Sequence, residues 1–166
     1  MIGELTVGGG AIGADECGRR WEAWGFGEVA AAFGEFEWDV VGWGMVWDYA
    51  DAGDHPELHQ TWMRDPSSGR YHLDVFREPH EGDRWICRRD CSITLPYAEL
   101  IEVGAAGIPY VIPEAALLFK AEAVRPKDQG DFERTVPLLP RYRVARLTEW
   151  ITRVHPPHIW LDVLGA

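Results

Sequence analysis

The alternation of apolar and polar residues is clearest between residues 58 and 77. Residues 58–64 and 71–77 are β-like runs, and Asp65-Pro66-Ser67-Ser68-Gly69 separates them. This spacer has the composition of a turn, because proline fixes φ and glycine supplies a positive φ. We expect an antiparallel hairpin over 57–77, in which Gln60 faces Asp74 if Arg64 faces Arg70. Alternation in the second run places Tyr71, Leu73 and Val75 on one face and His72, Asp74 and Phe76 on the other.

The residues before this hairpin are patterned less regularly. Residues 1–16 are rich in glycine, and residues 19–33 favour a helix that Gly25 and Gly27 interrupt. Residues 37–47 are typical of a strand rich in valine and tryptophan, and their glycines suggest bulges. We therefore expect a helix and then a strand ahead of the hairpin.

Short strands and then helices follow the hairpin. Residues 84–88 and 93–95 indicate two strands, and residues 97–112 indicate strand and turn. Helical spacing over 113–155 predicts three helices. Pro113 suits the first position of the first helix, which Pro126 ends. Asp128 is a natural cap for the second helix, with Asp131 three residues later.

The order of these elements, strands first and helices afterwards, predicts an α+β fold. We expect a mixed sheet followed by C-terminal helices. No repeat, linker or low-complexity block interrupts the chain. The sequence therefore predicts a single domain over 1–166, with a weakly patterned part at 1–36, mainly strands at 37–112 and mainly helices at 113–166.

The composition is that of an acidic globular protein. The 166 residues are 46% hydrophobic and carry a formal net charge of −11. That charge disfavours binding to a nucleic-acid backbone and suits a cationic ligand or partner, or merely solubility. Neither a membrane-spanning run nor a signal-peptide pattern is present, so we expect a cytoplasmic protein that binds no nucleic acid and no membrane. The nine tryptophans either fill the core or stack on a flat ligand.

One segment carries a family resemblance. Residues 112–132 read IPEAALLFKAEAVRPKDQGDF. This string resembles the helix that follows the catalytic sheet in the polymerase-β-like nucleotidyltransferase superfamily, in the branch of the aminoglycoside and lincosamide adenylyltransferases. The LDVF of the hairpin, the WICRRD and GIPYVIPE stretches and the ending VHPPHIWL are also similar to that branch. The resemblance covers about residues 37–162.

The resemblance implies a nucleotidyltransferase-like sheet and a definite chemistry. Such enzymes transfer AMP from ATP to a hydroxyl of a small acceptor and release pyrophosphate, with two Mg²⁺ ions between three carboxylates. By this resemblance, Asp74 matches the third carboxylate. A carboxylate among apolar residues is costly unless it is paired or metal-bound, which favours a role in the site; the alternative is a surface or paired aspartate. Lys120 and Lys127 would reach the triphosphate. They would share a face of a continuous helix, and the alternative is a solvated helix face.

The first two carboxylates of the family have no direct match. The family places an Asp-x-Asp shortly after a glycine turn, and none follows Val7-Gly8-Gly9-Gly10 here. Glu35, Glu37 and Asp39 are candidate replacements, because i, i+2 spacing puts carboxylates on one face of a strand.

These observations leave three hypotheses for function. The chain is an adenylyltransferase-like enzyme that uses ATP, Mg²⁺ and a small cationic acceptor, or an impaired relative that binds nucleotide or a protein partner. The third hypothesis is an unrelated structural domain in which the string from Lys120 to Asp131 is a coincidence. One carboxylate cannot fix two metal ions. We therefore expect little or no AMP transfer.

Overall fold

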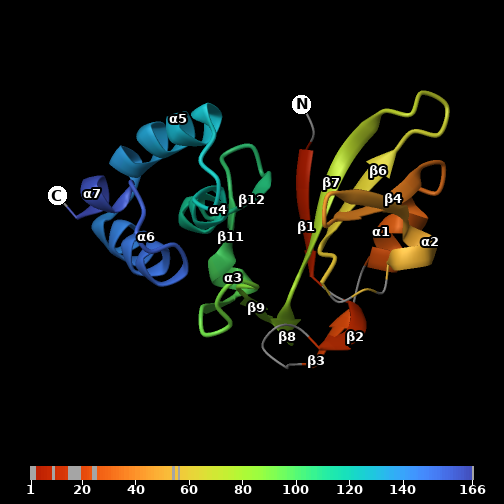
Figure 1. The fold of residues 1–166 in the computed structure, drawn as a ribbon, viewed down its shortest axis with the longest axis horizontal. Helices are drawn as coiled ribbons and strands as arrows, with labels where there is room; N and C mark the ends of the chain where they lie inside the picture. Colours follow the sequence, from red (N-terminus) through yellow and green to blue (C-terminus); the bar gives the residue numbers. More distant parts are fainter. Residues whose placement is uncertain are drawn as a thin grey trace. The chain divides into compact units, whose positions relative to one another are not determined.

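The computed structural model describes residues 3–8, 10–14, 20–23, 26–53, 55 and 57–165. The chain divides into two compact units, Met1–Thr94 and Leu95–Ala166. Strands dominate the first unit and helices the second, which confirms the predicted α+β class (Figure 1).

The first unit is built on a five-stranded mixed sheet. Its strands lie in the order β1-β7-β6-β4-β5, and β1 is parallel to β7 whereas the other neighbours are antiparallel. The bounds are Gly3–Gly8 for β1, Glu37–Gly42 for β4, Met45–Asp48 for β5, Gln60–Arg64 for β6 and Tyr71–Glu78 for β7. The predicted hairpin over 57–77 is confirmed as β6 and β7.

A β-bulge changes the register of that hairpin. Met63 pairs with Leu73 but Arg64 pairs with Tyr71, so His72 is the extra residue. Two parts of the sequence prediction are therefore wrong. Tyr71 does not share a face with Leu73, and Gln60 lies opposite Phe76 instead of Asp74.

A second hairpin replaces the single strand predicted over 37–47. Strands β4 and β5 are joined by Trp43 and Gly44, whose φ values of 50° and 73° give a two-residue turn with two left-handed positions. Gly44 thus supplies a turn where the sequence suggested a bulge. Because of this turn, β5 pairs with β4 and becomes the outer strand of the sheet.

Two helices cover one face of this sheet. Helix α1 (Phe26–Ala32) and helix α2 (Tyr49–Ala52) contribute to a core cluster around Trp38, Met63 and Val75. The helix predicted over 19–33 is correct only in its second half, because β3 (Arg20–Ala23) pairs with β2 (Gly10–Ala14) ahead of it. Trp24 and Gly25 lie outside the described residues.

Short elements complete the first unit. Strands β8 (His80–Glu81) and β9 (Arg84–Ile86) form a hairpin, and β10 (Thr94–Pro96) spans the boundary between the units. The short strands predicted at 84–88 and 93–95 are therefore confirmed. Trp85 is fully buried, as expected for a tryptophan that fills the core.

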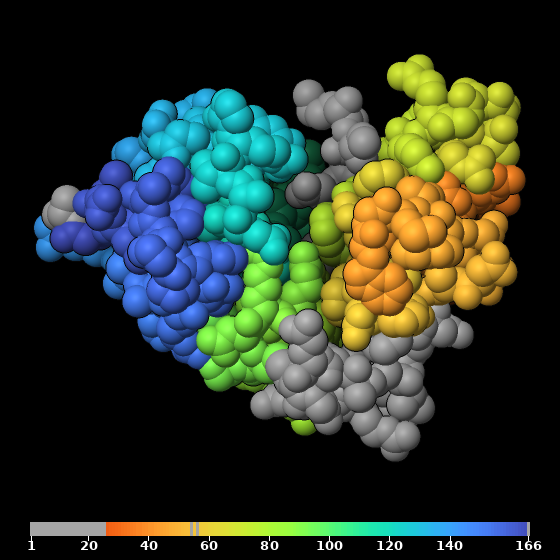
Figure 2. Space-filling model, viewed as in Figure 1, coloured from red at the N-terminus to blue at the C-terminus, as the bar shows by residue number. Residues whose placement is uncertain are grey.

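The second unit opens with α3 (Tyr97–Leu100) and the antiparallel pair β11 (Ile101–Val103) and β12 (Pro109–Val111). Four helices and a short 3₁₀ turn follow, in cyan to blue in Figure 2. They are α4 (Pro113–Lys120), α5 (Pro126–Thr135), the turn Val136–Leu138, α6 (Arg141–Val154) and α7 (Leu161–Leu164). The three helices predicted over 113–155 are confirmed.

Aromatic stacking and aliphatic burial hold these helices together. The rings of Phe132 and Trp160 stack with centroids 4.3 Å apart, and both side chains are buried. Leu118, Leu147 and Ile151 are fully buried beside other apolar residues of α4 and α6. Among the helices of the described residues, none is long and apolar enough to cross a membrane.

Candidate functional site

Asp74 lies on β7, an inner strand of the five-stranded sheet. Its neighbours Leu73 and Val75 pack into the cluster under α1 and α2, so alternation directs Asp74 to the opposite face, which we call the open face. The side chain is half-buried, and Gln60 Nε2 donates a hydrogen bond of 2.6 Å to Asp74 Oδ2. The predicted contact between these two side chains is made on a diagonal across the hairpin, despite the shifted register.

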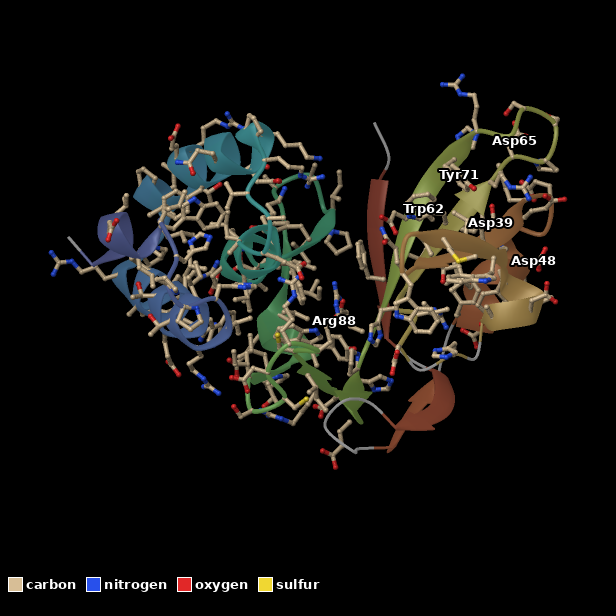
Figure 3. All side chains as sticks on the ribbon, viewed as in Figure 1. Asp39, Asp48, Trp62, Asp65, Tyr71 and Arg88 are labelled. Atoms are coloured by element: carbon tan, nitrogen blue, oxygen red, sulfur yellow. The ribbon has the colours of Figure 1, made fainter. Side chains whose placement is uncertain are left out.

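An acidic row crosses the open face at the level of Asp74. Strand pairing sets Asp48 opposite Asp39 and Asp39 opposite Trp62, three residues that Figure 3 labels. It also sets Trp62 opposite Asp74. Neighbouring strands are about 4.8 Å apart, so the backbones of Asp39 and Asp74 are separated by about 10 Å. Trp62 occupies the position between them. Two carboxylates that share one Mg²⁺ must bring their oxygens to about 2.1 Å from it, and this spacing opposes that.

Asp39 is held by groups of the sheet itself. Arg64 Nε and Tyr71 Oη each donate a hydrogen bond of 2.8 Å to Asp39 Oδ2, and Arg64 also pairs with Glu37 at 2.6 Å. The hydrogen bond to Asp39 raises the pKa of Arg64. Burial first, and the hydrogen bond to Asp39 second, raise the pKa of Tyr71. The three predicted replacement carboxylates thus divide: Asp39 and Glu37 share one arginine, and Glu35 is exposed ahead of β4.

One further acidic position was missed in the sequence. Strand β1 runs parallel to β7, and its register pairs Glu4 with Asp74. Glu4 is thus the acidic residue nearest to Asp74 along the row of strands. The signal for this strand was present, since Leu5 and Val7 alternate with Glu4 and Thr6, but the many glycines of residues 1–16 obscured it and no strand was predicted there.

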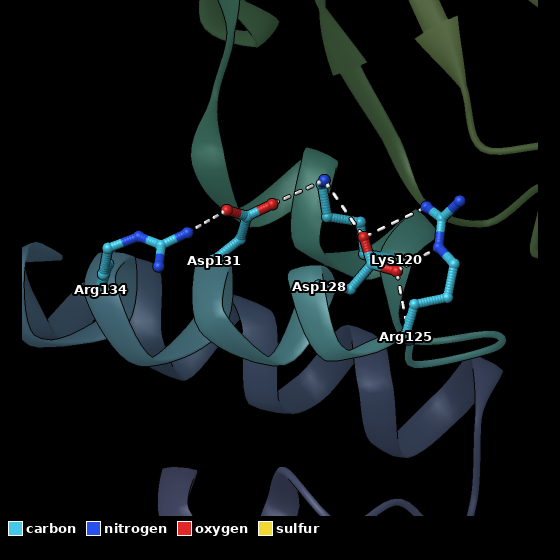
Figure 4. A network of polar contacts seen from close by, with 5 residues as sticks. All are labelled: Lys120, Arg125, Asp128, Asp131 and Arg134. Carbon is cyan, nitrogen blue, oxygen red and sulfur yellow. Dashed lines mark hydrogen bonds and ion pairs between the residues drawn. The ribbon is translucent and has the colours of Figure 1, made fainter.

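The predicted lysines belong to the second unit. Helix α4 ends at Lys120 and α5 begins at Pro126, so Lys120 and Lys127 do not share a continuous helix. Lys120 Nζ contacts Asp131 Oδ2 at 2.9 Å and Asp128 Oδ1 at 3.4 Å (Figure 4). Lys127 is exposed on α5. The structure thus places Lys120 in an ion-pair network, and a phosphate would have to compete for it.

Asp128 is the centre of that network. Its side chain is fully buried, and its Oδ2 accepts hydrogen bonds from Arg125 Nε at 2.6 Å and Arg125 N at 3.2 Å. Asp128 was predicted to cap α5, but the cap position is Arg125 and Asp128 is the third helical residue, whose carboxylate satisfies the backbone N–H of the cap. The hydrogen bond from Arg125 lowers the pKa of Asp128 to about 2, against the opposing effect of burial.

The charge of Lys120 is fixed by the same contacts. Burial acts to lower the pKa of Lys120, but the hydrogen bonds and charges of Asp131 and Asp128 outweigh it, so the pKa is raised. Asp131 also accepts a hydrogen bond of 2.7 Å from Arg134, and its pKa is lowered chiefly by the bond from Lys120. The network therefore stays ionised at neutral pH.

A second ionic cluster joins α4 and α6. Glu114 is fully buried in the first turn of α4, and its Oε1 lies 3.4 Å from Arg146 Nη1 and 3.6 Å from Arg143 Nε. Arg143 also binds Glu102 of β11 with two guanidinium nitrogens. Glu114 Oε2 has no hydrogen-bond partner among the described residues. A buried carboxylate held by arginines fits a structural role in this unit.

Comparison with protein families, curated proteins and solved structures finds no match to this chain. In the part of the chain that the structure describes, no three His, Cys, Asp or Glu side chains are grouped so as to hold a metal ion. The family resemblance of residues 112–132 therefore stays a prediction from sequence.

Proposed function

We propose that this chain binds a nucleoside triphosphate with Mg²⁺ on the open face around Asp74, in the manner of a nucleotidyltransferase, and that it transfers AMP to a small cationic acceptor slowly or not at all. One observation carries the proposal. Asp74 lies half-buried on an inner strand of a mixed sheet, on the face opposite α1 and α2, with a second acidic residue at the adjacent register position of β1.

The residues of the row differ in how well they fit a metal ion. Asp39 does not fit, because Arg64 and Tyr71 both donate to its Oδ2. Asp74 is the candidate ligand, and Glu4 lies at the paired position of the neighbouring strand β1. A bound Mg²⁺ would neutralise phosphate charge there. Gln60 would orient the carboxylate of Asp74, because its side-chain amide donates a hydrogen bond to Asp74 Oδ2.

This arrangement supports binding better than turnover. The transferred group and the leaving pyrophosphate carry several negative charges, and the family holds them with two ions between three carboxylates. Removal of a single charge-stabilising group costs about 10²–10³ in rate in other enzymes. With Asp39 engaged by Arg64, we expect transfer to be lowered at least that far.

Calorimetry with ATP tests the binding site. We expect weak binding that requires Mg²⁺ and is lost in Asp74→Asn and weakened in Glu4→Gln. Asp83→Asn is the matched control, because it removes an exposed carboxylate from a turn of the same unit. Equal binding by wild type and Asp74→Asn would show that Asp74 is not part of the site, and the proposal would then be wrong.

The resemblance also assigns Lys120 and Lys127 to the triphosphate, and the same titration tests this assignment for each lysine. We expect Lys120→Met to lower the melting temperature more than Lys127→Met, since Lys120 pairs with Asp131 and Asp128 whereas Lys127 is exposed. A variant Lys120→Met that melts at a lower temperature but binds ATP as well as wild type would assign Lys120 to the network with Asp128 and Asp131 alone.

A transfer assay separates the enzyme from the impaired relative. Radiolabelled ATP is incubated with the protein and a panel of aminoglycosides and related amino sugars. We expect no transfer above about 1% of an active enzyme's rate. Fast transfer that Glu37→Gln abolishes would show that β4 supplies the missing carboxylates, in spite of the contact between Arg64 and Glu37.

A further inference from the structure

Two carboxylates of β4 share one cation on the open face of the sheet. Glu37 and Asp39 are two positions apart, and Trp38 between them packs into the cluster under α1 and α2, so both acids lie on the opposite face. Arg64 Nη2 lies 2.6 Å from Glu37 Oε2, and Arg64 Nε lies 2.8 Å from Asp39 Oδ2. Adjacent N–H groups of one guanidinium fork therefore hold two carboxylates at once.

Strand pairing and burial fix this arrangement. Arg64 lies directly opposite Glu37 on the neighbouring strand β6, and diagonally across from Asp39. The side chain of Asp39 is only 8% exposed. A carboxylate buried to this degree is costly unless a cation compensates for it. Arg64 is the cation that does so here.

The same two acids have the chemistry of a divalent-cation site. Mg²⁺ and Mn²⁺ prefer oxygen ligands, and Mg²⁺ is often bound through one or two carboxylates while it keeps several waters. Oxygens that converge on one edge of a guanidinium also converge on one ion, whereas the backbones of Asp39 and Asp74 are about 10 Å apart. The side chain of Glu37 is 50% exposed, so water has access to this position.

Tyr71 leaves room for an ion at Asp39. Its hydroxyl donates to Asp39 Oδ2, the oxygen that Arg64 also uses, so neither group engages Oδ1. Burial and the hydrogen bond to Asp39 raise the pKa of Tyr71, so the phenol stays neutral. A neutral donor does not repel a metal ion. Arg64 is therefore the group that keeps one out.

We propose that Arg64 closes a divalent-cation site formed by Glu37 and Asp39, as an internal cation that takes the place of the metal. The contact is autoinhibitory, because the guanidinium both occupies the ligands and repels a second cation. The hydrogen bond to Asp39 raises the pKa of Arg64, so its charge persists and only displacement of the side chain opens the site. The inference does not require nucleotide binding at Asp74, since it concerns the metal ion alone.

Titration of the full chain with Mn²⁺, without nucleotide, tests the proposal, and electron paramagnetic resonance measures the free ion. Arg64→Gln removes the charge and keeps an amide that can donate to Asp39. We expect this variant to bind Mn²⁺ about tenfold or more tightly than wild type, because a unit charge a few ångström from the ion no longer repels it. Arg70→Gln is the matched control, since Arg70 is an exposed arginine of the same hairpin. It should bind Mn²⁺ as wild type does.

Two double variants locate the ion. Arg64→Gln combined with Glu37→Gln should lose the gain, because one of the two carboxylates is gone. Arg64→Gln combined with Asp74→Asn should keep it, which separates this site from the proposed nucleotide site. Failure of ATP binding at Asp74 would therefore leave the Mn²⁺ result unaffected.

Thermal unfolding gives a second measurement on the same proteins. Mn²⁺ should raise the melting temperature of Arg64→Gln more than that of wild type, because an ion that binds only the folded state stabilises it. If Arg64→Gln does not fold, Arg64→Lys is the second variant. An ammonium is a point charge that lacks the fork, so a smaller gain of about threefold is expected. Equal Mn²⁺ affinity of wild type and the folded variant would overturn the proposal, and so would a gain that survives Glu37→Gln.

Discussion

Replacement of Asp128 by asparagine tests how the helices of the second unit are held. The buried carboxylate accepts hydrogen bonds from Arg125 N, Arg125 Nε and Arg125 Nη2, and from Lys120 Nζ at 3.4 Å (Figure 4). Asparagine has nearly the same shape but keeps one acceptor oxygen and no charge. The change therefore removes charge-assisted bonds and creates little cavity.

The size of the loss follows from these contacts. Hydrogen bonds to a charged partner contribute about 1.5–3 kcal/mol each. The arginine end of this network is exposed and screened, so the bonds do not contribute their full sum. We expect Asp128→Asn to lower the free energy of unfolding by about 3 kcal/mol, and the melting temperature by about 6–12 °C for a chain of this length.

The pH dependence of the difference identifies its cause. The folded pKa of Asp128 is about 2, below the ordinary value. A lowered folded pKa gives stability that is fully present above the unfolded pKa of about 4 and is lost as the pH falls through about 2. Urea unfolding of wild type and Asp128→Asn should differ by a constant amount between pH 5 and pH 7, and the difference should vanish towards pH 2.

A matched control separates this effect from the loss of any carboxylate. Asp162 is exposed on α7, and Asp162→Asn should change the free energy of unfolding by about 0.5 kcal/mol or less. If Asp128→Asn lowered the free energy of unfolding no more than this control at pH 7, the carboxylate would not stabilise the packing of α4 against α5. A difference that persisted unchanged at pH 2 would refute the electrostatic argument.

Three further substitutions should alter stability, each measured by urea unfolding at pH 7. Trp43→Asn should stabilise the chain by about 1 kcal/mol, because asparagine adopts the left-handed conformation more readily; a loss would show that the exposed indole packs favourably. Val40→Ala should lower the free energy of unfolding by about 2–3 kcal/mol, since Val40 is fully buried. Val41→Ala, at a half-buried position of the same strand, should lower it by about 1 kcal/mol. Glu114→Gln should cost about 2–4 kcal/mol, because Arg143 and Arg146 lose their buried partner; an unchanged midpoint would mean that solvent replaces the carboxylate.

Local pattern was sufficient to predict the hairpin of β6 and β7 and the helices α4, α5 and α6. In these segments the periodicity, the turn composition and the prolines all agree. The register of the hairpin was not predictable in the same way. The bulge at His72 accompanies a turn closed by Gly69 N to Asp65 O, and it directs Tyr71 to Asp39, a residue 32 positions away.

In the candidate site, too, local features could be predicted from the sequence and long-range contacts could not. The placement of Asp74 on a strand, on the face away from Leu73 and Val75, follows from alternation alone. The engagement of Asp39 by Arg64 depends on the pairing of β4 with β6, and the position of Glu4 depends on a parallel pairing with β7. Both pairings bring together segments that are distant in sequence, so no local signal contains them.

The parallel pairing of β1 with β7 also has a consequence for the order in which the sheet assembles. Strands β4 to β7 are joined to their sequence neighbours or near neighbours, whereas Gly3 of β1 pairs with Leu73, about 70 positions later. Closing a loop of that length costs chain entropy before any contact compensates for it. During synthesis β1 also leaves the ribosome long before its partner exists. We expect β1 to dock last, so that the acidic position beside Asp74 is completed only in the final step of folding, and amide exchange at β1 should be the fastest of the five strands.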